Sequence, residues 1–239
     1  MLRAVTLDYW DTIYAGASIP DRVARRQEAL LEMLQALGAP VPAATFEPLY
    51  RESAIEAARW WREEHRGYST EDRIRWILDR LGVERPAGCA YIARAVDRVD
   101  ATLLEYPAPL LPGAREALEV LAGRFRLAIV SDIGFASGRA QDGLLDRDGV
   151  RRHFAATIYS MDVGHAKPRP EIFDAALAAL GSAPGETLHV GDNERTDVGG
   201  AIARGLRAVR LDAVRQGPES KAEFVATSLP ELAEYLLSQ

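Results

Sequence analysis

Short apolar segments, several of them rich in β-branched residues, recur along the chain and predict the strands of a buried sheet. They cover residues 4–7, 126–130, 156–159, 187–190 and 208–211. Between most of these segments, apolar residues recur at helical spacing, as in residues 114–121, 172–180 and 198–203. Alternating strands and helices favour a parallel sheet with helices on both faces, so we predict an α/β, doubly wound, Rossmann-like core.

A second pattern fills residues 15–106, where apolar residues recur at helical spacing and there is almost no strand signal. Four helices are expected there, over residues 23–37, 46–61, 74–81 and 92–103. Gly38 and Gly82 are expected to end the first and the third. We therefore predict an all-helical domain, residues 15–106, inserted into a core of residues 1–14 and 107–239. Near the carboxyl terminus, the capping-box spacing of Ser228 and Glu231 predicts a short helix over residues 232–237.

Four polar segments stand where apolar runs end. In chain order they are residues 7–12 (LDYWDT), 130–132 (VSD), 166–168 (AKP) and 190–197 (VGDNERTD). Because parallel strands bring their carboxyl ends to one edge of a sheet, carboxylates, a hydroxyl and one ammonium are expected to converge there. Such a group of side chains suits the binding of a divalent cation and attack on a phosphate.

In this order and spacing, the four segments resemble the motifs of the haloacid dehalogenase-like (HAD) hydrolase superfamily, over most of residues 1–14 and 107–239. The resemblance implies that the helical insertion is a cap that closes over the active site and sets substrate choice. It also implies a phosphatase in which Asp8 is the nucleophile and forms an aspartyl-phosphate with a small phosphorylated metabolite. In the family pattern, Mg²⁺ would be held by Asp8, the backbone carbonyl of Trp10 and Asp192.

Other residues of the motifs are expected to serve the same reaction. Lys167 is one of two lysines among 29 basic residues, which indicates a requirement for a compact ammonium that touches both Asp8 and a phosphate oxygen. Asp197 is expected to hold Lys167 or a metal-bound water. The Ser131 hydroxyl would donate to phosphate oxygens, and Thr12 would donate to the phosphate or support the first turn. The predicted catalytic set is Asp8, Lys167, Ser131 and Asp197, and the predicted substrate-binding set is Thr12, Ser131, Asp132 and Lys167.

Trp10 departs from the phosphatase pattern, because these enzymes carry there a second aspartate that protonates the leaving group. An indole cannot transfer that proton, and loss of a general acid–base costs about two to four orders of magnitude in rate. Asp11 would replace it only if the chain turns there, because neighbouring side chains of an extended segment point to opposite faces. His165, two residues before Lys167, is the other candidate. Turnover is therefore expected to be slow, confined to good leaving groups, or assisted by another group.

Trp10 also leaves two other functions open. In a 2-haloacid dehalogenase of this fold, Asp8 would attack carbon, and those relatives often have an aromatic residue at the position of Trp10. They usually lack the Gly-Asp metal motif that is kept here at Asp192, which ranks this function second. The third is a catalytically weak protein that binds phosphate and metal and regulates a partner.

Composition narrows the partners and the location. The net charge of −6 provides no positive surface for nucleic acid. The single cysteine, Cys89, excludes an intramolecular disulfide and suits a reducing compartment, so a cytoplasmic protein is expected. The amino-terminal segment reaches Asp8 too early for a signal peptide, and no apolar stretch approaches the about 18 residues of a membrane span.

Arg59, Arg62 and Arg66 share a helical stripe that meets either an anionic substrate or solvent. The sequence is compatible with both a monomer and a homodimer.

Overall fold

A computed structural model describes the chain except residues 17, 85–87, 215–216 and 218. Within the described residues, six strands form one parallel sheet in the order β3-β2-β1-β4-β5-β6. The strands are β1 (Ala4–Leu7), β2 (Arg126–Ser131), β3 (Phe154–Tyr159), β4 (Thr187–Gly191), β5 (Arg207–Leu211) and β6 (Phe224–Ala226). The central strands β1 and β4 are buried along their whole length, as in sheets with both faces covered.

The register of the central strands brings their carboxyl ends level. Leu7, the last residue of β1, pairs with Ile129 of β2 and with Val190 of β4. Asp8 and Asp192 follow β1 and β4 directly, so both leave the sheet at the same edge.

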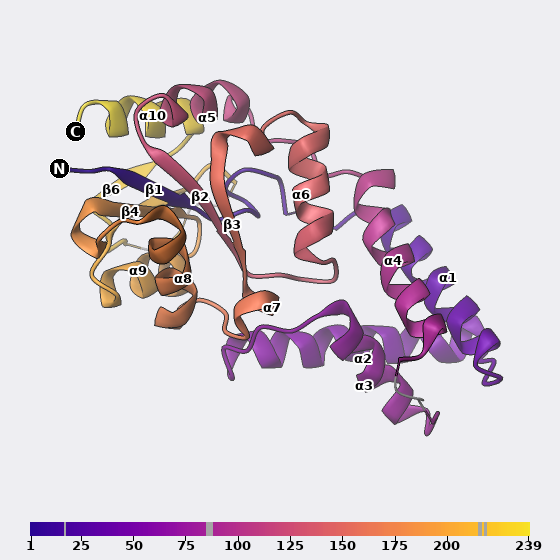
Figure 1. The fold of residues 1–239 in the computed structure, drawn as a ribbon. Coiled ribbons are helices and arrows are strands. Elements are labelled where there is room, and N and C mark those ends of the chain that lie inside the picture. The colour runs from indigo at the N-terminus through magenta and orange to yellow at the C-terminus, as the bar shows by residue number, and fades with distance from the viewer. Residues whose placement is uncertain (17, 85–87, 215–216, 218) are drawn as a thin grey trace.

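Helices cover both faces of the sheet (Figure 1). Apolar residues of α5, α6 and α10 form one core with the sheet, and residues of α8 and α9 form another. These helices, with the short α7 that follows β3, are α5 (Ala114–Ala122), α6 (Gly138–Arg147), α7 (Ser160–Val163), α8 (Pro170–Leu180), α9 (Gly199–Ala203) and α10 (Leu229–Leu237). The arrangement confirms the predicted doubly wound, Rossmann-like α/β fold.

A separate group of helices occupies the interval between β1 and α5. It comprises α1 (Pro20–Ala36), α2 (Ala43–Arg62), α3 (Thr70–Arg80) and α4 (Ala90–Glu105). Their apolar faces pack into one cluster of their own, which also takes in Phe135 from the loop after β2. Figure 1 shows the four helices to one side of the sheet, with α2 reaching toward α7. All four lie within residues 15–106, of which residues 17 and 85–87 are outside the described part, so the four predicted helices are confirmed, while the bounds of the inserted domain stay a prediction.

Some elements differ from the sequence-based expectation. The prediction missed β6, whose three residues at the sheet edge are too few for a periodic pattern. It also missed α6, which contains two glycines and only three buried apolar residues. At α10, the Ser228 hydroxyl accepts the Glu231 N–H, so the predicted N-cap is confirmed, but the Glu231 carboxylate accepts the Thr227 N–H and does not complete the capping box. No helix in the described ranges is long and apolar enough to cross a membrane.

Candidate active site

Asp8 follows the buried strand β1 and begins a tight turn. Its N–H donates to the Val190 carbonyl at 2.8 Å, which continues the β1–β4 ladder by one residue. The chain then reverses, because the Tyr14 N–H donates back to the Tyr9 carbonyl at 3.0 Å. Asp11 takes a left-handed conformation with φ of 54°, which aspartate tolerates better than most residues. The turn places both Asp8 and Asp11 on the wall of one cleft.

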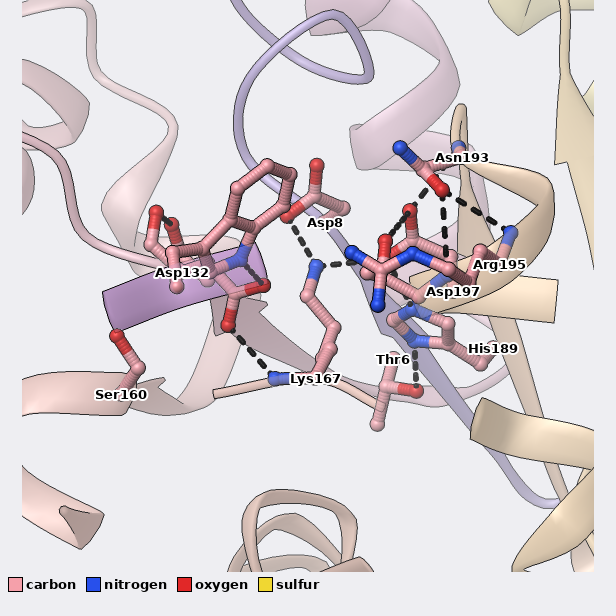
Figure 2. Close-up of polar contacts among 12 residues, drawn as sticks. Thr6, Asp8, Asp132, Ser160, Lys167, His189, Asn193, Arg195 and Asp197 are labelled. Carbon is pink, nitrogen blue, oxygen red and sulfur yellow. Dashed lines mark hydrogen bonds and ion pairs between the residues drawn. The ribbon is translucent and has the colours of Figure 1, made fainter. Parts of the chain in front are cut away.

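Lys167 joins two of the predicted carboxylates. Its Nζ donates to Asp8 Oδ1 at 2.5 Å and to Asp197 Oδ1 at 2.6 Å, as Figure 2 shows. The lysine side chain is 2% exposed. Burial acts to lower the pKa of Lys167, but the charges of Asp197 and Asp8 outweigh it and raise the pKa, so the ammonium stays charged. Burial raises the pKa of Asp8 well above its usual range, although Lys167 opposes this.

Asp197 accepts hydrogen bonds at both of its carboxylate oxygens. His189 Nε2 lies 3.1 Å from Asp197 Oδ1, and the Asn193 N–H donates to Asp197 Oδ2 at 3.0 Å. The other His189 nitrogen lies 2.9 Å from the Thr6 hydroxyl, so a neutral ring with its proton on Nε2 satisfies both contacts. Burial tends to raise the pKa of Asp197, but Lys167 and His189 outweigh it and hold the pKa below its usual range. His189 and Thr6 were not predicted as site residues, since their only signal is that polar residues occur in otherwise apolar strands.

Asp132 connects the cap to the core. Its Oδ2 accepts the Trp61 Nε1–H at 2.8 Å, and its Oδ1 accepts the Lys167 backbone N–H at 2.9 Å (Figure 2). Trp61 lies on α2, while Asp132 follows β2. Burial is the main cause that raises the pKa of Asp132. The carboxylate therefore positions the Lys167 segment and fixes α2 above it, a contact that the sequence analysis did not predict.

The loop after α2 makes a second connection to the segment before Lys167. The Gly67 N–H donates to the Gly164 carbonyl at 3.0 Å, and the Ala166 N–H donates to the His65 carbonyl at 2.9 Å. A Cβ on Gly67 would lie 1.8 Å from the Ser160 carbonyl oxygen, so only glycine fits this close approach.

The cleft between these elements has a volume of about 500 Å³. Its core wall contains Asp8, Trp10, Asp11, Asp132, Lys167, Asp192 and Asp197, and its cap wall contains Trp61, Arg62, Tyr68 and Arg73. The structure therefore brings five of the predicted catalytic, substrate-binding and metal side chains together with Trp10. Its size suits a small metabolite.

Three carboxylates of the cleft form a possible cation site. Asp8, Asp192 and Asp197 each offer an oxygen within 4.8 Å of the other two. Both Asp197 oxygens already accept hydrogen bonds, which fits the holding role predicted for it, and the metal-ligand roles expected of Asp8 and Asp192 stay predictions. Burial and the charge of Asp197 raise the pKa of Asp192 to about 6, a cost that a bound cation would relieve. An oxygen-only donor set with excess negative charge fits Mg²⁺.

Gly191, just before Asp192, is required by packing. A Cβ at this position would lie 2.3 Å from the Asp197 Cγ. The Gly-Asp pair therefore lets Asp197 lie against the end of β4 while Asp192 faces the cleft.

Two predicted phosphate-binding hydroxyls lie outside the cleft wall. Ser131 is completely buried, and its hydroxyl donates to the Gln141 side chain at 3.1 Å. Thr12 is also completely buried, and its hydroxyl has no hydrogen-bond partner among the described residues. The phosphate contacts expected of both residues stay predictions.

The remaining candidate residues, His165 and the three arginines, differ in whether they line the cleft. The His165 side chain is 42% exposed and lies 4.0 Å from Glu171 rather than in the cleft wall. Within the arginine stripe, Arg59 pairs with Glu56 and Glu64, and Arg66 pairs with Asp72. Arg62 is the member of the stripe that lines the cleft.

Comparisons with known proteins agree with this architecture. The chain is 27% identical to the ribulose-1,5-bisphosphate 5-phosphatase of Halopiger xanaduensis, over 98% of this chain and 99% of that protein. It is 27% identical to the glyceraldehyde 3-phosphate phosphatase of Methanopyrus kandleri, over 88% of this chain and 84% of that protein. A match at 36% identity to the pyrimidine 5'-nucleotidase YjjG of Escherichia coli covers 53% of this chain and only 56% of the nucleotidase.

The fold has a close counterpart among solved structures. The 2-haloacid dehalogenase of Pseudomonas syringae superposes with a TM-score of 0.71 at 24% identity, covering 100% of this chain and 99% of the dehalogenase, a likeness of fold. The parallel sheet, the helices inserted after β1 and the carboxylate–lysine site at the sheet edge are together typical of an α/β hydrolase. A sequence profile of haloacid dehalogenase-like hydrolases matches residues 2–205, and the chain belongs to this family.

Proposed function

We propose that the protein is a Mg²⁺-dependent phosphatase of a small phosphorylated metabolite and that it works through an aspartyl-phosphate on Asp8. The observation that carries the proposal is the buried Lys167 ammonium shared by Asp8 and Asp197 in a cleft that also contains Asp192. The names of several relatives support the reaction class, because they describe hydrolysis of phosphate monoesters.

The first step forms a bond from an Asp8 oxygen to phosphorus and breaks the bond from phosphorus to the ester oxygen. Lys167 holds the attacked phosphate through its oxygens and keeps the Asp8 carboxylate in position. A magnesium ion bound by Asp8, Asp192 and the Trp10 carbonyl would neutralise phosphate charge and orient the group for attack. Water then attacks the aspartyl-phosphate, releases phosphate and restores Asp8.

The leaving alcohol needs a proton that Trp10 cannot supply. Asp11 is the better placed of the two predicted replacements, since its backbone turns and its side chain lines the cleft, whereas His165 does not line it. Asp11 Oδ1 accepts the Gly16 N–H at 2.7 Å, which fixes the orientation of the carboxyl group. We propose Asp11 as the proton donor for alcohols and expect little need for it with acyl phosphates, whose leaving group is already stable as an anion.

A second function is favoured by the aromatic side chain of Trp10 in the cleft wall. In a 2-haloacid dehalogenase, an Asp8 oxygen would attack the carbon that carries the halogen, halide would leave, and water would hydrolyse the resulting ester. This chemistry needs no proton donor at position 10, but it gives no role to the carboxylate of Asp192.

The identity of the released product, phosphate or chloride, distinguishes the two functions. Phosphate release from p-nitrophenyl phosphate and acetyl phosphate is measured with magnesium or EDTA, and chloride release from 2-chloropropionate is measured in parallel. We expect magnesium-dependent phosphate release that is lost in Asp8→Asn and kept in Asp174→Asn, a surface control whose carboxylate contacts Arg204. Chloride release without phosphate release would establish the dehalogenase instead. Release of neither phosphate nor chloride would favour a binding protein that has lost turnover.

A further inference from the structure

Arg73 is a buried cation in the cap wall of the cleft. It lies on α3 and is 6% exposed. Its Nε donates to the Ser53 hydroxyl at 3.0 Å, and its Nη2 donates to the Tyr50 carbonyl at 3.3 Å. Within the described part of the chain, no carboxylate oxygen lies within 4.0 Å of its nitrogens. A buried charge is costly unless a counter-charge accompanies it, and the residues that the structure describes supply none at this distance.

A second arginine, which is not part of the cleft wall, adds positive charge at the Phe135 ring. The guanidinium carbons of Arg73 and Arg26 lie 4.0 and 5.5 Å from the centre of the Phe135 ring. Arg26 comes from α1 and donates to the Thr102 hydroxyl at 3.0 Å, and it too has no ion pair with a described carboxylate. The Phe135 ring is therefore flanked by two cations.

The two walls of the cleft consequently carry opposite charge. The core wall has several carboxylates around one ammonium, whereas the cap wall has Arg62 and Arg73. A cation and the reacting phosphate account for the core wall, but they leave the guanidinium of Arg73 without a counter-charge among the described residues. A substrate with negative charge at both ends would satisfy both walls.

We propose that Arg73 binds a second anionic group of the substrate, at the end away from the phosphate that is removed. The substrate class is then a small phosphate monoester that also carries a carboxylate or a second phosphate. The planar guanidinium suits either group, because it donates two parallel hydrogen bonds to paired oxygens. This assignment rests on the proposed phosphatase function and specifies the kind of substrate.

Matched substrate pairs test the proposal. 3-Phosphoglycerate is compared with glycerol 3-phosphate, which replaces the carboxylate by a hydroxymethyl group. Propane-1,3-diol bisphosphate is compared with the monophosphate. The charged member of at least one pair should have the higher kcat/KM by about tenfold or more, as expected where a site pairs a substrate group that the analogue lacks. The pair with the larger ratio identifies carboxylate or phosphate.

Variants of Arg73 separate recognition from folding. Arg73→Met should reduce the kcat/KM ratio of the substrate with the second anionic group to the substrate without it to nearly one. Arg73→Lys should keep part of this difference. Arg80→Met is the matched control, since Arg80 lies on the same helix, stacks on Trp76 at 4.5 Å and is outside the cleft. A merely structural Arg73 would lower both members of a pair equally and leave the ratio unchanged, which would overturn the proposal. A wild-type ratio near one in both pairs would overturn it as well.

Calorimetric binding to Asp8→Asn keeps this proposal separate from the proposed function. One outcome is that the wild type hydrolyses no ester while Asp8→Asn binds 3-phosphoglycerate or the bisphosphate more tightly than the analogue without the second anionic group. If Arg73→Met then removes this difference in affinity, the phosphatase function is wrong and the anion site is correct. Equal binding within both pairs, or no binding, would overturn the anion site. Hydrolysis of both members of each pair at equal rates would overturn it while leaving the phosphatase intact.

Discussion

Replacement of Lys167 by methionine tests the buried charge cluster that holds the site together. The ammonium contacts Asp8 and Asp197 at 2.5 and 2.6 Å, and all three side chains are 10% exposed or less. Asp197 would keep its bonds from His189 and from a backbone N–H, whereas the Asp8 carboxylate would lose the one partner that its side chain has among the described residues. Removal of one member of a buried ion pair costs about 3–5 kcal/mol.

For a chain of this size, such a loss lowers the melting temperature by about 6–20 °C. The effect should depend on pH in a defined direction. Without Lys167, the pKa of Asp8 rises further above its unfolded value, so the penalty is full above that raised pKa and is relieved as the carboxyl takes up a proton. The difference in unfolding free energy between wild type and variant should therefore shrink as the pH falls from 8 to 5.

Urea unfolding at several pH values, with calorimetry at pH 7.5, measures both effects. The chain supplies its own control in Lys221, the other lysine, which is exposed, and Lys221→Met should stay within about 0.5 kcal/mol of wild type. A loss of less than about 1 kcal/mol in Lys167→Met, well below the usual range for a broken buried pair, would refute the reasoning. An unchanged difference across the pH range would refute it too.

Three further predictions concern the neighbours of this cluster. Trp10→Asp should raise kcat for alkyl phosphates by up to about 10², less than the full effect of a missing general acid–base because Asp11 already supplies part of that role, and should leave p-nitrophenyl phosphate and acetyl phosphate nearly unchanged; a similar gain for all three kinds of substrate in steady-state assays would contradict it. Trp61→Phe removes an N–H that donates to the Asp132 carboxylate and should cost about 1.5–3 kcal/mol, and a double-mutant cycle with Asp132→Asn checks that the two losses are not additive. Burial lowers the pKa of His189, so its stabilising neutral form is favoured above the unfolded pKa of about 6.5 and its contribution is lost as the pH falls below that value. Relative to His189→Asn, the wild type should lose up to about 1.4 kcal/mol per pH unit there, and parallel unfolding curves for the two proteins would exclude the effect.

The convergence of Asp8, Lys167, Asp192 and Asp197 was predictable from local patterns. Each of Asp8 and Asp192 directly follows an apolar strand, and parallel strands place their carboxyl ends at one edge whatever the details of packing. The distances from Lys167 to Asp8 and Asp197 agree with the contact expected of its ammonium. The four helices of the insertion could also be predicted, because each has its own stripe of apolar residues.

The turn at Asp11 was not predictable in the same way. The sequence left open whether its side chain would reach the site, since an extended segment would have pointed it elsewhere. The left-handed backbone and the hydrogen bonds of the turn decide that it lines the cleft.

By itself, the sequence determined the sheet apart from its edge strand β6, the helices of the insertion and the residues that meet at the sheet edge. These features follow from hydrophobic period and from the position of polar residues at strand ends, both of which act over short stretches of chain. Tertiary structure alone decided that the Ser131 hydroxyl bonds to Gln141, that Trp61 reaches Asp132 from 71 positions away, and that Arg73 is buried without a carboxylate among the described residues. Such contacts depend on how side chains from separate elements pack, and no local pattern encodes the direction of a side chain toward a partner that folding has yet to bring near.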